Sequence, residues 1–109
     1  MEINFKKAVV QMLILLCLSK KNYSIYEINQ IINTYSGNSL AVENFYVVIY
    51  RLEERGLIKK AEKIKGLGAK YRWTYTITED GRIELERQIK EYRSLSTGVE
   101  SMFAFYEGE

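Results

Sequence analysis

The sequence predicts a mainly helical α+β fold in which three helices precede a β-hairpin and a long final helix, the order α-α-α-β-β-α. Helical periodicity of apolar residues runs through the first half of the chain and returns after residue 78. A strict alternation of aromatic and polar residues occupies residues 70–77. With 109 residues and 47% apolar content, the chain can form one hydrophobic core. We expect one domain over residues 1–78 and a helical extension over residues 79–109.

The first helix is predicted around the longest apolar run, residues 8–18. Its apolar residues lie nearly all round the helix axis, so we expect this helix to be central and surrounded by protein. The run has eleven residues and includes Gln11, whereas a membrane-spanning helix needs about 20. Residues 19–22 (Ser-Lys-Lys-Asn) that follow do not resemble a signal-peptide cleavage site. We therefore expect a cytoplasmic protein without a membrane segment.

Capping and stop signals delimit the next two helices. Residues 24–27 (Ser-Ile-Tyr-Glu) fit a capping box and Gly37 fits a helix stop, so a helix is predicted between them. Its predicted apolar stripe is Ile25, Ile28, Ile32 and Tyr35. A third helix is predicted over residues 40–55, ending at Gly56. Its core face is predicted to be Phe45, Val48, Ile49 and Leu52.

Residues 57–77 predict a β-hairpin with a flexible tip at residues 66–69. Its second strand alternates polar residues with Tyr71, Trp73, Tyr75 and Ile77. A period of two should place these four residues on one face, against the helices, with the cations on the other face. Residues 51–72 carry eight Lys or Arg against three Glu, a net charge of +5, whereas the whole chain has +2. Such a block often indicates an anionic partner, although a solvated surface is the commoner explanation of lysine runs in general.

The last helix is predicted to begin after Thr78, a capping residue. Its first turn holds Glu79 and Asp80, which complement the positive end of the helix dipole. Apolar residues then recur at spacings of four and three, which is typical of coiled-coil packing. This seam consists of Leu85, Ile89, Tyr92, Ser96, Val99, Phe103 and Tyr106. Ser96 and Gly98 weaken the middle of the seam, so the helix could bend there.

This order of elements is that of the winged helix-turn-helix fold, in which the third helix enters the DNA major groove and the hairpin lies along the flanking backbone. Asn44 can pair with an adenine edge, and Arg51 can reach guanine or phosphate. Tyr46 and Tyr50 can donate hydrogen bonds to phosphates. We expect double-stranded DNA as the partner. The predicted DNA-binding residues are Asn44, Tyr46, Val47, Tyr50, Arg51, Lys63, Lys65, Lys70 and Arg72.

The sequence offers few groups for catalysis or metal binding. Histidine is absent, and Cys17, the one cysteine, is predicted to be a core residue. No nucleophile with a base and no converging carboxylates are evident, so we expect no enzyme activity, no cofactor and no metal. The alternative to a DNA-binding regulator is a winged-helix module that binds another protein, because one fold serves unrelated functions.

Residues 44–58 (NFYVVIYRLEERGLI) resemble a motif of the PadR-like family of transcriptional regulators, which reads Thr-Leu-Tyr, then Leu, Arg-Leu-Glu and Gly-Leu-Ile. Residues 26–28 resemble the Gly-Tyr-Glu-Leu start of the family's second helix, and residues 75–81 resemble its Tyr-Arg-Leu-Thr-Glu-x-Gly wing exit. The resemblance implies a homodimeric repressor whose C-terminal dimerisation helix packs against the partner's first and last helices. It also implies that Tyr46 contacts DNA.

The resemblance further implies a small hydrophobic or aromatic effector at the dimer interface. In a multidrug-binding branch of the family, a tryptophan of the final helix stacks flat ligands, and Tyr92 falls at that position here. Plain packing of Tyr92 in the seam is the alternative. The residues predicted for the effector or dimer interface are Leu85, Ile89, Tyr92, Val99 and Phe103.

Overall fold

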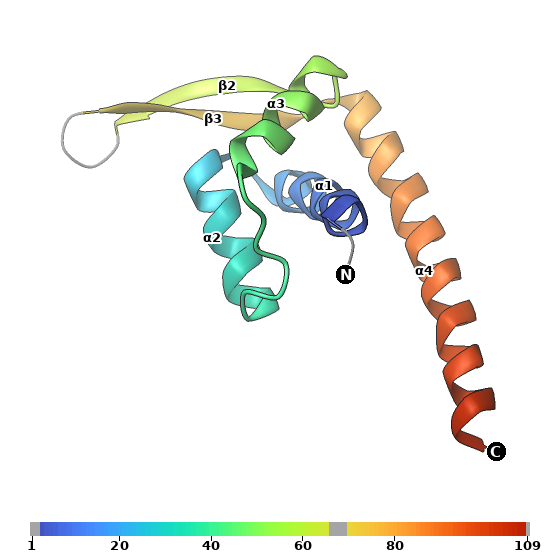
Figure 1. Cartoon of the computed structure of the whole chain (residues 1–109). Helices are drawn as coiled ribbons and strands as arrows, with labels where there is room; N and C mark the ends of the chain where they lie inside the picture. Colours follow the sequence, from blue (N-terminus) through green and yellow to red (C-terminus); the bar gives the residue numbers. More distant parts are fainter. Residues whose placement is uncertain (1–2, 66–69, 109) are drawn as a thin grey trace.

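The computed structural model describes residues 3–65 and 70–108. Within them the element order is α1 (Ile3–Lys20), β1 (Tyr23–Ser24), α2 (Ile25–Ser36), α3 (Phe45–Glu54), β2 (Ile58–Lys65), β3 (Tyr71–Ile77) and α4 (Glu79–Gly108) (Figure 1). The predicted order of helices and hairpin is confirmed, and the short strand β1 is an addition. The predicted hairpin tip, residues 66–69, lies outside the described residues.

Helix α1 lies at the centre of the fold, where α2, α3, β3 and α4 pack around it (Figure 1). Val10, Ile14 and Leu15 are fully buried. Cys17 is half-buried at the edge of the core, and desolvation raises the pKa of its thiol. The predicted central position of this helix is confirmed. None of the described helices combines the length and the hydropathy needed to span a bilayer.

Helix α2 begins and ends where its local chemistry predicts. The hydroxyl of Ser24 accepts a hydrogen bond from the Glu27 amide, and the Glu27 carboxylate accepts one from the Ser24 amide, which completes the capping box. Gly37 ends the helix in the left-handed region, at φ 59°, which glycine adopts at little cost. The predicted stripe is wrong at one position, because Tyr35 is 88% exposed beyond the edge of the core.

Helix α3 starts five residues later than predicted, at Phe45 rather than at Leu40. Residues 37–40 form turns, in which the Ala41 amide donates a hydrogen bond to the Asn38 carbonyl, and Leu40 and Val42 pack half-buried against the core before the helix begins. Asn44 then adopts a left-handed conformation, φ 55°, directly before the helix. The predicted core face of α3 is confirmed by four buried residues, Phe45, Val48, Ile49 and Leu52.

The sheet has the strand order β1-β3-β2, and both neighbouring pairs are antiparallel. Ile58 pairs with Ile77 and both are buried, so the base of the hairpin belongs to the core. The outer half of the hairpin extends past the helices (Figure 1). Its outer residues Lys63, Lys65 and Tyr71 are exposed.

Helix α4 leaves the base of the hairpin and runs away from the rest of the fold (Figure 1). Thr78 caps it as predicted, because its hydroxyl accepts a hydrogen bond from the Gly81 amide. Leu85 is buried in the core, whereas the far end of the helix is exposed. Ser96 and Gly98 do not interrupt α4, which is one continuous helix of 30 residues. A helix tolerates one glycine at a cost of only about 1 kcal/mol, so its hydrogen bonds continue through Gly98.

Candidate nucleic-acid interface

The outward face of α3 presents aromatic rings and a cation to solvent. Tyr46 and Tyr50, four residues apart, stack edge to face with ring centroids 5.9 Å apart. Both are about half exposed, Arg51 is exposed and Val47 is half-buried. Asn44 is exposed just before the helix, and its side chain makes no capping hydrogen bond. The structure therefore places the first five predicted DNA-binding residues at one surface, although Asn44 lies outside the helix on which it was predicted.

The hairpin contains a β-bulge in β2. Lys60 pairs with Tyr75 and Lys63 with Trp73, so two residues of β2, Ala61 and Glu62, oppose the single residue Thr74 of β3. The Thr74 hydroxyl accepts a hydrogen bond from the Glu62 amide, at 3.1 Å, and donates one to the Glu62 carbonyl, at 3.0 Å. Thr74 thus pairs with the backbone groups that the bulge removes from the regular ladder.

The bulge changes which face of the hairpin carries the cations. Residues paired across an antiparallel ladder point to the same face, so Lys60, Lys63 and Lys65 share the face of Tyr75, Trp73 and Tyr71. The sequence prediction, which placed aromatic residues on one face and cations on the other, is therefore wrong for β2. It is also wrong in placing Tyr71 and Trp73 against the helices, because they are 67% and 39% exposed on the outer half of the hairpin.

Aromatic rings hold several of these cations in place. The ammonium groups of Lys60 and Lys63 lie 5.6 Å and 5.3 Å from the centroid of the Trp73 ring. The guanidinium of Arg72 lies 4.8 Å from the centroid of the Tyr26 ring, at the start of α2. Such cation–π contacts restrict long side chains that would otherwise sample many rotamers.

A notch of about 520 Å³ lies where α2, α3 and the hairpin meet. Two cations line it, Lys60 and Arg72, together with mostly aromatic residues. The remaining lining residues are Ser24, Ile25, Tyr26, Tyr50, Trp73 and Tyr75. Burial raises the pKa of Tyr75 to about 12, so its hydroxyl keeps its proton at neutral pH. We refer to this cavity as the wing notch; it joins the exposed face of α3, through Tyr50, to the hairpin.

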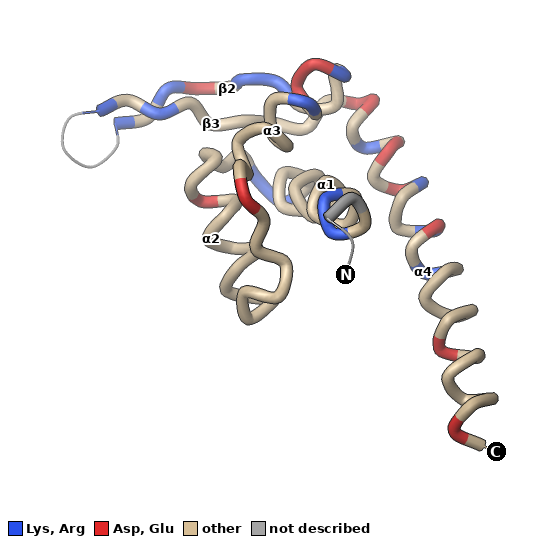
Figure 2. Tube along the Cα trace, in the orientation of Figure 1, with Lys and Arg blue, Asp and Glu red and all other residues tan. Residues whose placement is uncertain are grey.

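The charge of the hairpin is not neutralised within the described part of the chain. The ion pairs formed among residues 3–65 and 70–108 link Glu84 to Arg55 and Arg87, and Glu91 to Arg87, and none involves a hairpin cation. Lys63, Lys65 and Lys70 are exposed and Arg72 is half-buried. Figure 2 shows this basic hairpin projecting to one side of the fold, away from the acidic residues of α4.

Sequence reasoning missed three residues of this surface, Tyr26, Lys60 and Trp73. The alternation pattern assigned Trp73 to the core, and Lys60 was counted only within the basic segment. Lys60 and Lys63 share the face of Trp73 because of the bulge. At the bulge, the hydroxyl of Thr74 forms hydrogen bonds with the backbone of Glu62. A threonine on a strand is too common to signal a bulge in a sequence.

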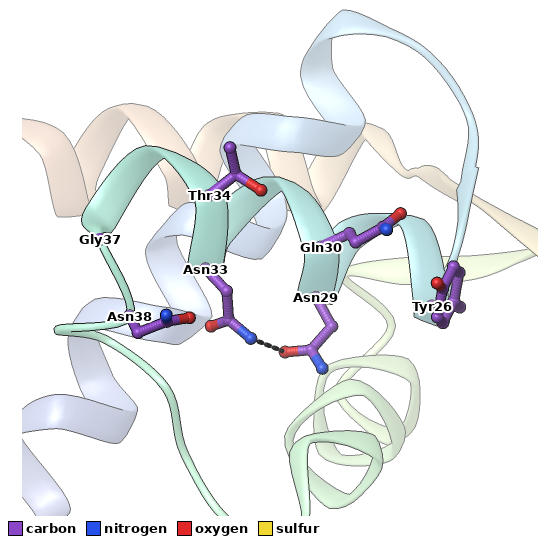
Figure 3. Close-up of a pocket in the computed structure, with 7 residues that line it drawn as sticks. All are labelled: Tyr26, Asn29, Gln30, Asn33, Thr34, Gly37 and Asn38. Atoms are coloured by element: carbon purple, nitrogen blue, oxygen red, sulfur yellow. Dashed lines mark hydrogen bonds between the residues drawn. The ribbon is translucent and has the colours of Figure 1, made fainter.

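A second groove, of about 280 Å³, follows the outer side of α2 and carries no charged residue (Figure 3). Asn29 and Asn33 lie side by side there, joined by a hydrogen bond of 3.4 Å from the Asn33 amide nitrogen to the Asn29 side-chain oxygen. The side-chain oxygen of Asn33 is buried and has no hydrogen-bond partner among the described residues. The groove offers hydrogen-bonding groups, but it lacks the positive charge of the wing notch.

The residues predicted for a dimer or effector interface divide into two groups. Leu85 is buried and Ile89 is half-buried against the core of the same chain. Tyr92, Val99 and Phe103 are between 44% and 53% exposed. A hollow of about 260 Å³ lies between α1 and α4, and its lining includes Phe5, Met12, Tyr92 and Leu95.

Comparison with known proteins shows which family and which solved structures this chain resembles. Residues 14–87 match the model of the transcriptional regulator PadR-like family. Among curated proteins no relative matches the chain. A transcriptional regulator from Clostridium thermocellum is similar in structure, with a TM-score of 0.76, 21% identity and coverage of 93% of this chain and 96% of that chain. A PadR-like transcriptional regulator from Bacillus cereus has a TM-score of 0.75 and 23% identity, over 89% and 93% of the two chains.

A third structure shows a relative with its ligand. Bacillus subtilis PadR in complex with operator DNA has a TM-score of 0.65 and 23% identity, over 74% of this chain and 47% of that chain. These likenesses confirm the predicted fold class, a mainly helical winged helix-turn-helix with a long C-terminal helix.

Proposed function

Because this chain belongs to the PadR-like family of transcriptional regulators, we propose that it binds double-stranded DNA as a homodimer and represses transcription. The observation that carries this proposal is the row of hairpin cations, which form no ion pair within residues 3–65 and 70–108 and which continue through the wing notch to the exposed face of α3. The Bacillus subtilis relative, whose fold is similar, was solved with operator DNA, which supports the same partner here.

In this proposal α3 reads the major groove and the hairpin contacts the backbone. Tyr46, Val47, Tyr50 and Arg51 face outward on α3, and Asn44 precedes them. Lys63, Lys65, Lys70 and Arg72 neutralise phosphates, which contributes affinity for any sequence. We therefore expect Arg51 and Asn44 to determine sequence preference and the hairpin cations to determine salt dependence.

The dimer is proposed to form through α4. Tyr92, Val99 and Phe103, and farther out Met102, Phe105 and Tyr106, expose apolar surface along a helix that leaves the fold. A two-fold axis would place two copies of α3 in successive major grooves, about 34 Å apart, on a palindromic operator.

A small aromatic effector is proposed to bind in the hollow between α1 and α4, next to Tyr92. Six of its ten lining residues are apolar, and its polar groups are Gln11, Arg87, Gln88 and Glu91. A ligand that binds the free dimer more tightly than the DNA-bound dimer would relieve repression, because it shifts the equilibrium toward the free dimer.

The experiment that tests the proposed function is a fluorescence-anisotropy titration against the DNA upstream of the protein's own gene and against scrambled DNA, at two salt concentrations. We expect at least a hundredfold preference for the upstream duplex, and weaker binding at higher salt. Equal, weak binding to both duplexes would contradict a local operator. Absence of binding at low salt would contradict DNA binding and favour a protein partner for the face of Tyr46 and Tyr50.

A further inference from the structure

The wing notch has the chemistry of an anion site. Lys60 and Arg72 supply its positive charge, and no acidic residue lines it. Its volume of about 520 Å³ is many times the roughly 30 Å³ that one water occupies, so it can admit a phosphate group with part of an adjoining sugar. Tyr26, Tyr50 and Tyr75 add hydroxyl groups that can donate hydrogen bonds to oxygen.

The two cations are held in place before any ligand arrives. The Arg72 guanidinium lies over the Tyr26 ring, and stacking of this kind leaves the N–H groups in the guanidinium plane free for phosphate oxygens. Lys60 lies over Trp73, the single tryptophan of the chain. Because their rotamers are already restricted, less conformational entropy is lost on binding.

The bulge determines which lysines serve the notch. Without it, Lys60 and Lys63 would point to opposite faces of β2, since they are three residues apart. With it, Lys60, Lys63 and Lys65 form a row on one face, while Lys59, paired with Thr76, points to the other. A row that continues outward from the notch suits a linear polyanion better than an isolated small anion.

We infer that the wing notch binds one backbone phosphate of DNA in each protomer, with Lys60 and Arg72 as its ligands and with Tyr26 and Trp73 as platforms that position them. This inference rests on the proposed function. It deepens that function by adding Lys60 as a phosphate ligand beside Arg72, by assigning positioning roles to Tyr26 and Trp73, and by separating Lys60 from its neighbour Lys59.

The test replaces single phosphates of the upstream duplex by neutral methylphosphonates, one position at a time, and measures binding by anisotropy. For the unaltered protein we expect one position in each half-site at which replacement weakens binding about tenfold, the loss expected for one charge-assisted contact. In Lys60→Gln the same methylphosphonate should lower the affinity for DNA by less than about twofold, because this variant has already lost the contact with that phosphate. In Lys59→Gln, which removes the same charge from the opposite face, the tenfold cost should persist.

A second pair of variants tests the platform. Tyr26→Leu removes the ring under Arg72 and should weaken binding about threefold, in line with an exposed cation–π contact. Tyr26→Phe keeps the ring and should stay within about twofold of the unaltered protein. Equal losses in both variants would contradict the positioning role and indicate that the hydroxyl is what matters.

Three outcomes would overturn the inference. In the first outcome, the protein binds the duplex while no methylphosphonate position loses its effect in Lys60→Gln. That result refutes the phosphate site and leaves the proposed function intact. In the second outcome, Trp73 fluorescence changes saturably with inorganic phosphate at fixed ionic strength, and no methylphosphonate position loses its effect in Lys60→Gln. That result assigns the notch to free phosphate. Failure of the unaltered protein to bind any duplex refutes the proposed function and this site with it.

Discussion

Gly81 lies where the first turn of α4 meets the end of the hairpin. A Cβ atom at this position would lie 2.1 Å from the carbonyl oxygen of Leu57 and 2.7 Å from Cγ1 of Ile77. The Leu57 oxygen belongs to the backbone and accepts a hydrogen bond from the Thr78 amide, so it cannot move aside freely. The absence of a side chain at residue 81 therefore sets how closely α4 approaches the core.

Gly81→Ala should destabilise the protein by about 1–3 kcal/mol, the usual cost of overpacking a core. Urea denaturation followed by circular dichroism measures this change. The matched control is Gly98→Ala on the same helix, where a Cβ would meet nothing within 4 Å. This control should stabilise α4 by roughly 0.5–1 kcal/mol, because alanine favours a helix over glycine. Similar effects at both positions would contradict the close approach at Gly81.

Glu84 links α4 to the rest of the fold through several partners. Its carboxylate accepts hydrogen bonds from Arg87, at 2.6 Å and 3.0 Å, and from Gln88, at 2.7 Å. Arg55, at the end of α3, lies 3.9 Å away and also reaches toward Gln11 of α1. The hydrogen bonds from Arg87 are the largest of the effects that together lower the pKa of Glu84 to about 2.

Lowering the pH should therefore reduce the free energy of unfolding, partly because Glu84 becomes protonated. A carboxylate whose pKa is lower in the folded state stabilises that state above its ordinary pKa of 4.5, and this contribution is lost as the pH falls from there toward about 2. Glu84→Gln should show a shallower loss of folding free energy across this window, measured by urea denaturation at several pH values. Glu86→Gln, an exposed neighbour, is the control and should follow the unaltered protein.

Among the elements, the hairpin depends on the two hydrogen bonds between Thr74 and Glu62. Thr74→Val keeps the shape of the side chain but removes its hydroxyl, so the Glu62 amide and carbonyl lose their partner. We expect a loss of about 1 kcal/mol in folding free energy, faster hydrogen exchange at the Glu62 amide and a change in Trp73 emission.

The control for Thr74→Val is Thr76→Val on the same strand, which leaves the bulge untouched. It should alter neither the exchange at Glu62 nor the emission of Trp73. If the two variants behaved alike, the bulge would not depend on the Thr74 hydroxyl.

The element boundaries show which features a sequence can predict. Ser24, Gly37 and Thr78 act through hydrogen bonds or backbone angles within a few residues, so their effect is visible in the local pattern. The start of α3 is not visible in the local pattern, because Leu40 and Val42 pack against the core from the turn and loop that precede the helix. The sharing of one face by Lys60 and Lys63 was equally hidden, since it depends on pairing with a different strand.

At the scale of the whole molecule, the exposed seam of α4 determines the proposed assembly. Phe103→Asp places a charge in the apolar surface that the partner would bury, so the dimer should dissociate into folded monomers in analytical ultracentrifugation. Affinity for the upstream duplex should fall by at least a hundredfold, because the two half-sites are no longer linked.

The control for Phe103→Asp is Ser94→Asp, which adds the same charge at an exposed position on the opposite side of α4, far along the helix from Phe105. It should remain dimeric and bind DNA normally. A Phe103→Asp protein that stayed dimeric would locate the interface elsewhere.

The hydroxyl of Thr78 also donates a hydrogen bond of 2.7 Å to the Gly56 carbonyl, so the end of α3, the hairpin and the start of α4 are joined at one point. A helix of 30 residues is about 45 Å long. At that length, a tilt of about 10° at this junction moves the far end of α4 by about 8 Å. In the proposed dimer, α4 would act as a lever, and a small change in packing around Gly81 would become a large change in the distance between the two DNA-reading helices.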